Sequence, residues 1–318
     1  MVNATPRVRV ARRPVHGVIL LNKPLGLSSN QALQKVKWLL RALKAGHTGT
    51  LDPLATGVLP LCFGAATKFS QVHLDADKLY KATVRLGVVT ATGDSEGEIL
   101  KQQDVEITAE QLQNVLPEFL GEIVQTPPMY SALKHEGKAL YEYARAGIEV
   151  ERAARRVVIH ELKANWMDPQ TFEMEVRCSK GTYIRTLAVD IGDALGCGAS
   201  LIGLQRTASG LATLDQCISL EELEGMSEAQ RMKQLKPPQF LLEGFPTVVL
   251  EDEDAGRFLT GMRRRIEMPD TPLVQVMGKN SSALLGLGRV VCGELIAERL
   301  LSPIEIKEYL EQTIEVGK

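Results

Sequence analysis

The sequence predicts an α+β protein with a large N-terminal unit, followed by a small β-barrel-like unit. Two observations lead to this fold class. Strand-like and helix-like segments follow one another without a strict strand-helix-strand rhythm, and the segments after about residue 246 are short, strand-like and rich in glycine. Hydrophobic residues make up 44% and charged residues 24% of the 318 residues, the balance of an ordinary globular protein. Disordered and collagen-like chains are therefore excluded.

The chain starts with a basic segment and a short strand. Residues 1–15 are rich in arginine, contain proline and show no hydrophobic period, so we expect a disordered basic arm. The apolar residues 18–21 predict a strand, which ends at the turn of residues 23–26.

A basic helix is predicted after this turn. Ser28 and Gln31 have the spacing of a capping box, and apolar residues then recur at helical intervals, at Leu33, Val36, Leu40 and Leu43. Residues 1–51 carry nine Lys or Arg and no Asp or Glu, although the whole chain has a net charge of -2. This segregation is typical of a surface that faces phosphates, and equally of a basic tail followed by a solvated helix face. Charge alone leaves both readings open.

Further elements complete the two units. Residues 80–86 and 172–178 alternate between apolar and polar side chains, which predicts half-buried strands, and helices are expected at 108–120, 138–146 and 186–195. The prolines and glycine of residues 232–246 predict a linker, so we expect one domain at 16–240 and a second at 246–318. The second contains strand-like pieces at 247–250, 273–277 and 283–291 and ends in a helical tail from 302 to 318.

The sequence shows no sign of membrane insertion or secretion. Its longest apolar runs, residues 17–21 and 59–66, are far shorter than the ~18 residues of a membrane span. The basic start leads into no continuous apolar core of a signal peptide. The five cysteines include no Cys-x-x-Cys pair, so neither a disulfide framework nor a zinc site is expected. We therefore expect a cytoplasmic protein.

The first candidate site is the glycine-rich segment of residues 46–57, directly after the basic helix. Its glycines permit tight turns and the close approach of another molecule, and Pro53 favours an extended backbone at Asp52. Asp52 is the first acidic residue of the chain, so we expect a locally positive setting that keeps it ionised. The alternative is an aspartate that caps a turn or a helix. His47 is a ligand, a base or a loop histidine, and its position does not discriminate between these roles.

The second candidate site is a strand-to-helix junction at residues 178–187. It offers Lys180, Tyr183 and Arg185 together, and a buried arginine there would pair with a carboxylate through two hydrogen bonds. The alternative is an ordinary connection with exposed charges. Tyr80, at the start of a strand, is either a core aromatic or a platform on which a base stacks.

Several known chemistries lack their sequence motifs. The chain has no phosphate-binding P-loop, no dinucleotide-binding glycine motif and no zinc deaminase signature, and His160-Glu161 does not continue into a zinc-binding helix. We therefore expect chemistry based on carboxylate, guanidinium and phenol groups, with no metal and no cofactor.

Six ordered motifs together resemble the bacterial tRNA pseudouridine-55 synthases, the TruB family, over nearly the whole chain. The motifs are Asn22-Lys-Pro-Leu-Gly-Leu-Ser-Ser29, residues 45–60, Ala66-Thr-Lys-Phe69, Thr90-Ala-Thr-Gly-Asp94, residues 125–134 and Cys178-Ser-Lys-Gly-Thr-Tyr-Ile-Arg185. Such a set is far more specific than one short motif. The resemblance implies a pseudouridine synthase sheet flanked by helices, an RNA-gripping insertion at about 124–152 and a PUA domain, an RNA-binding β-barrel, within 246–318.

The resemblance also implies roles for single residues. Asp52 matches the catalytic aspartate, and Arg185 matches the arginine that forms a salt bridge with it. Tyr80 matches the tyrosine that stacks on the target uracil, with a further role as a base left open. The implied substrate-binding residues are His47 beside the outgoing nucleotide, Tyr183 and Leu204 in the pocket and Lys23 beside the cleft.

The implied activity is isomerisation of the T-loop uridine at tRNA position 55 to pseudouridine. The base leaves its stack, the N1–C1′ bond breaks, and C5 joins C1′ without net redox change. Asp52 acts as a nucleophile at C1′ or C6, or as a base that leads to a glycal, and the sequence does not choose. The implied partner is the tRNA T-arm, with no membrane and no obligate protein partner, and the family default is a monomer.

Two other functions compete with this one. A non-catalytic RNA-binding or tRNA-folding chaperone would keep the same scaffold, although the retained Asp52, Tyr80 and Arg185 speak against it. A glycosidase would need a second carboxylate to work with Asp52, and we count no second acid in the matched motifs.

Overall fold

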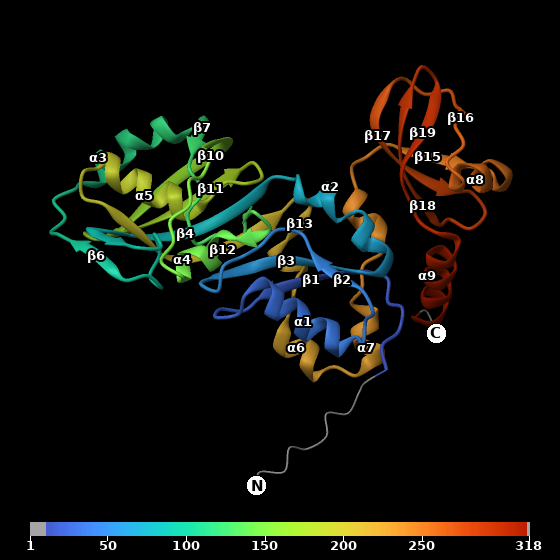
Figure 1. The fold of residues 1–318 in the computed structure, drawn as a ribbon, viewed down its shortest axis with the longest axis horizontal. Helices are drawn as coiled ribbons and strands as arrows, with labels where there is room; N and C mark the ends of the chain where they lie inside the picture. The colour runs from blue at the N-terminus through green and yellow to red at the C-terminus, as the bar shows by residue number, and fades with distance from the viewer. Residues whose placement is uncertain (1–10, 317–318) are drawn as a thin grey trace, which may run out of the picture.

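The computed structural model describes residues 11–316, which form two main β-sheets and two short hairpins with helices packed around them (Figure 1). The strands of the larger sheet are β1 (Gly17–Lys23), β2 (Ala45–His47), β3 (Ala55–Phe63), β4 (Lys78–Leu86), β7 (Gly121–Gln125), β10 (Arg155–Asp168), β11 (Thr171–Cys178), β12 (Ala199–Ser209), β13 (Ala212–Thr213) and β14 (Ile218–Ser219). They follow the spatial order β14-β1-β3-β12-β4-β11-β10-β7, while β2 pairs with β3 and β13 with β12. Two short hairpins lie beside it, β5 (Val88–Thr90) with β6 (Ile99–Gln102) and β8 (Lys134–His135) with β9 (Lys138–Ala139).

The larger sheet is mixed, as the predicted fold class requires, and its centre is the pair β4 and β12. β12 is antiparallel to β4 and parallel to β3, with Arg206 opposite Tyr80 and Leu204 opposite Ala82. Along β4 the even-numbered residues 78–86 face the protein interior and Lys81 and Arg85 face outward, which confirms the predicted alternation. Tyr80, Leu204 and Arg206 therefore lie on the interior face of the sheet.

The predicted helices are present, with boundaries that local chemistry explains. They are α1 (Ser29–Leu39), α3 (Ala109–Val115), α4 (Leu140–Arg145) and α5 (Ile184–Ala194). The larger unit also contains three helices that were not predicted, α2 (Ser70–Leu74), α6 (Leu220–Gly225) and α7 (Glu228–Lys233). Ser28 and Gln31 form the expected capping box at the start of α1, but the helix ends at Leu39 and leaves Leu43 exposed. The helix expected at 108–120 continues beyond α3 as a 3-10 turn that contains Pro117. Within residues 11–316, no helix is long and apolar enough to cross a membrane.

The helices cover the interior face of the larger sheet in two groups. α3 and α5 pack over β4, β10, β11 and β12, whereas α1, α6 and α7 pack over β1 and β3. Tyr80 and Leu204 contact both hydrophobic clusters and are themselves only partly buried. They therefore lie at the seam between the two groups of helices, where the sheet is accessible.

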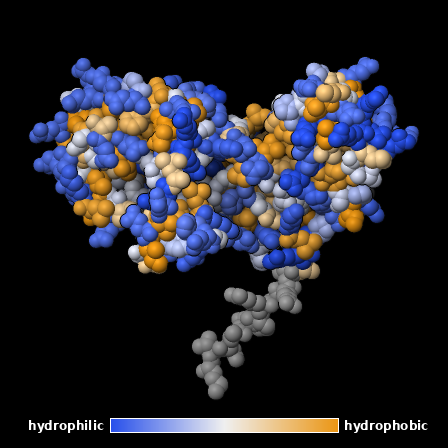
Figure 2. Space-filling model, turned by 45° about the horizontal axis from the view of Figure 1, so that its top comes forward, coloured by the Kyte–Doolittle hydropathy of each residue, from blue (hydrophilic) through white to orange (hydrophobic). Residues whose placement is uncertain are grey.

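The second sheet is a separate curled unit (Figure 1). It contains β15 (Thr247–Leu250), β16 (Arg264–Arg265), β17 (Thr271–Gly278), β18 (Leu284–Val291) and β19 (Glu294–Leu300), in the order β15-β17-β18-β19-β16, with α8 (Asp252–Leu259) against it. The barrel-like unit predicted from the sequence is thus a curled five-stranded sheet. Figure 2 shows the molecule as two lobes, with hydrophobic residues scattered among hydrophilic ones on the visible face.

The predicted C-terminal helix is α9 (Pro303–Val316), and it fastens the second sheet to the larger unit. The His16 amide donates to the Gln312 side chain at 2.9 Å, and that side chain donates back to the His16 carbonyl at 2.7 Å. Lys68 donates to Glu305 at 2.6 Å. Leu284, Leu287 and Leu301 also belong to a hydrophobic cluster shared with β1 and β3. α9 therefore ties the two units together by polar contacts beside an apolar interface.

Two sequence expectations require correction. Residues 1–10 of the expected disordered arm lie outside the described residues, but Arg13 and Val15, at its end, take part in the fold. Arg13 forms a β-bridge with Ala42, and Val15 is 1% exposed in the core, because its apolar side chain fills the space beside α1. The expected linker at 232–246 is also packed, since it contains a 3-10 helix, Pro238–Leu242, whose apolar side chains are buried against β1 and β3.

Candidate active site

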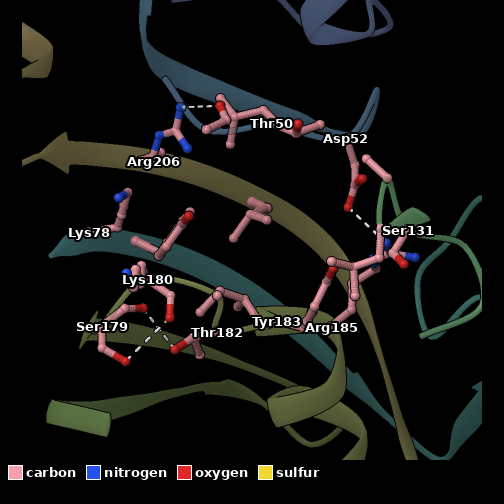
Figure 3. A pocket seen from close by; sticks show the side chains of 18 of the residues that line it. Thr50, Asp52, Lys78, Ser131, Ser179, Lys180, Thr182, Tyr183, Arg185 and Arg206 are labelled. Carbon is pink, nitrogen blue, oxygen red and sulfur yellow. Dashed lines mark hydrogen bonds and ion pairs between the residues drawn. The ribbon is translucent and has the colours of Figure 1, made fainter. Parts of the chain in front are cut away.

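A cavity of about 370 Å³ lies over the seam of the larger sheet (Figure 3). Most of its walls come from the loop before β3, the adjacent strands β4 and β12, residues 179–185 at the start of α5, and residues 131–133 of the expected insertion, with Leu74 and Arg155 completing the lining. Of the seven predicted site residues, this cavity brings together Asp52, Tyr80, Tyr183, Arg185 and Leu204. Apart from Tyr183 and Arg185, these residues belong to separate segments of the sequence, so the sheet and the N-terminus of α5 create their proximity.

The loop that carries Asp52 is held from both sides. From α1, the Ser29 hydroxyl donates to the Leu51 carbonyl at 3.0 Å and accepts from the Leu51 amide at 2.7 Å. On the other side, Gly57 has a φ of +100°, and a Cβ there would lie 2.2 Å from the Arg206 carbonyl oxygen of β12. Only glycine fits this contact. The loop therefore presents Asp52 in one fixed position at the edge of the cavity.

Arg185 connects Asp52 to a second, buried carboxylate. Its Nη2 lies 3.0 Å from Asp52 Oδ2, and its Nη1 lies 3.3 Å from Asp94 Oδ2. The same guanidinium donates to the Thr92 carbonyl at 3.0 Å and to the Tyr130 carbonyl at 2.6 Å. Because its side chain is 5% exposed and these four partners surround it, Arg185 has little freedom to turn. It can hold Asp52 in a fixed orientation.

The environment of Asp52 differs from the expected one in its effect on ionisation. Burial raises the pKa of the Asp52 carboxyl above its usual 3.8, and the neighbouring Asp94 raises it further. Arg185 and Lys23 act in the opposite direction, but burial is the largest influence, although 36% of the side-chain surface remains exposed. The expectation that positive neighbours alone would keep Asp52 ionised omitted this cost of burial.

Tyr80, Leu204 and Tyr183 form an apolar and aromatic surface inside the cavity. Tyr80 and Leu204 lie on adjacent strands, and burial raises the pKa of the Tyr80 hydroxyl. Tyr183 immediately precedes α5, where its amide N–H has no helical acceptor and donates instead to the side-chain oxygen of Gln125 at 3.0 Å. The Arg155 guanidinium lies 4.9 Å from the centre of the Tyr183 ring. Such a surface can hold a planar aromatic ring next to Asp52.

Two predicted residues, His47 and Lys23, do not line the cavity. Lys23 is 0% exposed, and its ammonium donates to the carbonyls of Pro24 at 2.9 Å and Leu27 at 2.5 Å. Burial lowers the pKa of Lys23 to about 8. His47 lies in β2, and burial lowers its pKa as well. Lys23 therefore stabilises the turn before α1. It acts on Asp52 by electrostatic attraction, without a direct contact.

The sequence reasoning missed three residues that shape the site: Asp94, Lys78 and Arg206. Asp94 belongs to the motif Thr90–Asp94 and shares Arg185 with Asp52, so the expectation of no second acid in the matched motifs was wrong. However, Asp94 is 3% exposed and does not line the cavity, which leaves it no access to a bound sugar. Lys78 and Arg206 do line it. Both could have been found from the alternation of side chains along a strand, because Lys78 lies two residues before Tyr80 and Arg206 two residues after Leu204.

The described residues offer no obvious metal centre. Within residues 11–316, no group of three or more His, Cys, Asp or Glu side chains is arranged to hold a metal ion. The site instead combines one partly accessible carboxylate, its arginine partner and an aromatic wall. This arrangement suits nucleophilic or general-base chemistry on a molecule with a planar ring.

Two protein-family descriptions match consecutive parts of the chain. Residues 37–184 match the TruB family pseudouridylate synthase N-terminal domain, and residues 185–242 match the tRNA pseudouridylate synthase B C-terminal domain. The boundary between the two falls at Arg185, so the cavity is built from both matched regions.

Individual relatives and solved structures agree with these matches. The chain is 58% identical to the tRNA pseudouridine synthase B of Verminephrobacter eiseniae over 311 residues, which cover 96% of this chain and 94% of that protein. It is 54% identical to the tRNA pseudouridine synthase B of Chromobacterium violaceum over 282 residues, which cover 88% of this chain and 92% of that protein. An H/ACA RNP bound to a substrate RNA containing 2′-deoxyuridine includes a chain of similar fold. The TM-score is 0.68 at 24% sequence identity, over 95% of this chain and 92% of that chain. A chain of a Cbf5-Nop10-Gar1 complex is similar with a TM-score of 0.67 at 26% sequence identity, over 97% of this chain and 93% of that chain.

Proposed function

The chain belongs to the TruB family of pseudouridylate synthases, and we propose that it isomerises the T-loop uridine at position 55 of tRNA to pseudouridine. As a member of this family it is a tRNA pseudouridine synthase, an isomerase. We further propose that it acts in the cytoplasm as a monomer, without a cofactor or an obligate protein partner.

The observation that carries this proposal is the ion pair of Asp52 and Arg185 at the edge of a cavity lined by Tyr80 and Leu204. A uracil ring that has left the T-loop stack would pack between the tyrosine and the leucine. Its sugar would then lie toward the carboxylate, which Arg185 orients. Tyr183, beside Arg155, would close the far wall.

The chemistry needs only groups that the chain supplies. The N1–C1′ bond breaks with its electron pair moving to N1, the ring turns, and C5 bonds to C1′. Asp52 either bonds to C1′ or C6 as a nucleophile, or removes the C2′ proton so that a glycal forms. In each route an ionised Asp52 is required, and its pair with Arg185 holds the reacting oxygen in place.

We propose that the T-arm reaches this cavity between two RNA-binding parts of the chain. Residues 124–152 form the RNA-gripping insertion; in support, its residues 131–133 line the cavity and its Tyr130 carbonyl accepts from Arg185. Residues 246–318 form the second RNA-binding unit, similar to a PUA domain. His47, in the partly exposed β2 ahead of the Asp52 loop, would lie against the outgoing nucleotide. Lys23 would support the cleft from within.

Mass spectrometry of an unmodified T-arm transcript tests the proposed function. After incubation with the protein alone, we expect pseudouridine at the T-loop uridine and at no other uridine of the transcript. A transcript whose target uridine is replaced by cytidine is the matched control. Tight binding without pseudouridine would instead indicate a tRNA-folding chaperone on the same scaffold.

The pH dependence of this activity follows from the setting of Asp52. Burial raises the pKa of this carboxyl. As the pH falls, Asp52 therefore becomes protonated earlier, at a higher pH than an ordinary aspartate does. We therefore expect kcat/KM to fall on the acid side of the profile, with a midpoint above the usual pKa of aspartate. It should reach its full value only at higher pH. The pH profile of kcat/KM on the T-arm transcript measures this midpoint. A midpoint at or below 3.8 would show that Arg185 and Lys23 outweigh burial.

A further inference from the structure

Two buried cations on the floor of the cavity, Lys78 and Arg206, have no role in the chemistry described so far. They are 6% and 1% exposed, and both line the cavity. Arg206 lies opposite Tyr80 on the neighbouring strand, and Lys78 precedes Tyr80 by two residues on the same strand face. We call Lys78 and Arg206 the cationic pair.

The cationic pair has backbone carbonyls as partners and no carboxylate. The Lys78 ammonium donates to the carbonyls of Leu74 at 2.6 Å and Ala76 at 2.5 Å. Arg206 donates to the Val58 carbonyl at 2.7 Å and to the Gly49 carbonyl at 3.2 Å. Among the described residues neither cation forms a salt bridge.

Two other cations of the cavity have carboxylate partners, whereas Arg155 lies against the Tyr183 ring. Arg185 pairs with Asp52, and Lys180 pairs with Asp75 at 2.8 Å. A buried charge without a carboxylate in direct contact costs folding free energy. Burial, followed by the positive charge of Arg206, lowers the pKa of Lys78 to about 8, although the more distant Asp75 and Asp77 act in the opposite direction. The fold therefore maintains positive charge at this end of the cavity at a cost to its stability. A negative charge that forms at this end of the cavity only during the reaction would explain why the positive charge is kept there.

The strand geometry indicates which part of the substrate meets the cationic pair. Leu204 pairs with Ala55 just after the Asp52 loop, and Arg206 follows two residues further along β12, about 7 Å away by strand geometry. Figure 3 shows Asp52 at one end of the cavity and Lys78 with Arg206 at the other. A uracil that packs on Tyr80 with its sugar at Asp52 therefore extends its far edge toward the cationic pair.

We propose that the cationic pair stabilises the negative charge that develops on the uracil ring when its bond to the sugar breaks. This inference rests on the proposed function. The electron pair of the N1–C1′ bond moves to N1 and is shared by resonance with O2 and O4. C1′ bonds to an Asp52 oxygen, or Asp52 takes the C2′ proton, and the same uracil anion results. When C5 has bonded to C1′, Asp52 is released or returns its proton to C2′, and the ring moves one proton from C5 to N1.

This role agrees with the burial of the two cations. Fixed charges inside a site from which water is excluded act strongly on charge that forms in the transition state. A phosphodiester is the other anion of the substrate, but it lies on the backbone outside the cavity, whereas the cationic pair lies on its floor. The pair also favours uracil over cytosine, because cytosine presents an amino donor where uracil presents the O4 acceptor.

Replacement of Lys78 by methionine tests the proposal, because methionine keeps most of the length and removes the charge. We expect the single-turnover rate of pseudouridine formation to fall by about 10²-fold, while the Kd for the T-arm transcript changes by less than about 3-fold. Lys78→Gln, which retains a donor for one carbonyl, is expected to show the same loss. Lys81→Met is the matched control, since Lys81 lies on the same strand but faces outward and pairs with Glu173.

A transcript with 5-fluorouridine at the target separates charge stabilisation from a structural effect. Fluorine withdraws electrons and itself stabilises the uracil anion, so the loss caused by Lys78→Met should shrink to about 10-fold. Because C5 then carries fluorine and has no proton to pass to N1, the rate is followed as formation of the C5–C1′ bond, with the fluorine retained. Equal losses with uridine and 5-fluorouridine, or no loss at all, would overturn the proposal. Weaker binding with a flatter salt dependence and an unchanged rate would assign the pair to a phosphodiester instead. Wild-type turnover in the same assay separately checks the proposed function.

Discussion

Replacing Asp52 by asparagine is expected to abolish pseudouridine formation, with a loss of about 10⁴-fold or more. Asparagine keeps the shape of the side chain but has neither the charge of a nucleophile nor the basicity to accept a proton. Arg185 would keep Asp94 and the carbonyls of Thr92 and Tyr130 as partners, so the site should remain folded. Binding of the T-arm transcript should therefore persist within about 3-fold of wild type.

The free energy of unfolding gives a second, independent readout of Asp52→Asn. Because the pKa of Asp52 is raised in the folded protein, its ionised form is less favourable there than in the unfolded chain above the usual carboxyl pKa. At neutral pH, loss of this charge should leave stability unchanged or increase it. Asp104→Asn, at an exposed aspartate, is the matched control. Near-normal turnover of Asp52→Asn in the mass spectrometry assay would show that Asp52 is not the catalytic residue.

Local patterns predicted the elements that position the site. The capping box of Ser28 and Gln31 and the alternation along β4 depend only on neighbouring residues, and both are present in the structure. The end of α1 was less predictable, because the apolar spacing continues to Leu43 whereas the helix ends at Leu39. Local rules do not determine where a tertiary contact ends a helix, here the β-bridge between Arg13 and Ala42.

The charge pattern of the first 51 residues illustrates what the sequence could not show. Its excess of positive charge suggested a surface that faces phosphates, yet Arg13 lies 2.9 Å and Arg41 3.7 Å from Glu228, and Lys35 lies 3.9 Å from Glu224. These acids come from α6 and α7, nearly 200 residues later in the chain. Folding therefore places negative side chains beside the basic helix, and a count of charge along the sequence overestimates the positive potential of this surface.

The site shows the same dependence on long-range contacts. Pairing of Asp52 with Arg185 was expected from the resemblance to a family, since nothing in the local sequence joins them. Asp94 was overlooked although its motif was recognised, because its role depends on sharing Arg185 with Asp52. Lys78 and Arg206 were overlooked for a related reason: the strand pairing that places them on the cavity floor is a property of the sheet.

Arg185→Met is expected to have the other large effect, and it should act on turnover, pH dependence and stability together. Without the guanidinium, Asp52 loses its fixed orientation, and turnover should fall by about 10³-fold. The acid side of the pH profile should move to higher pH, because Arg185 lowers the pKa of Asp52. Stability should fall by about 3–5 kcal/mol, since Asp94, with 4% of its side chain exposed, is left without its counter-charge.

The double variant Arg185→Met/Asp94→Asn separates these effects. Removing the second charge relieves the unpaired carboxylate, so thermal and denaturant unfolding should recover toward wild type. Turnover should not recover, because Asp52 still lacks the group that orients it and favours its ionised form. Recovery of turnover together with stability would mean that Arg185 acts only by holding the fold. Recovery of stability alone would establish Arg185 as the residue that positions Asp52.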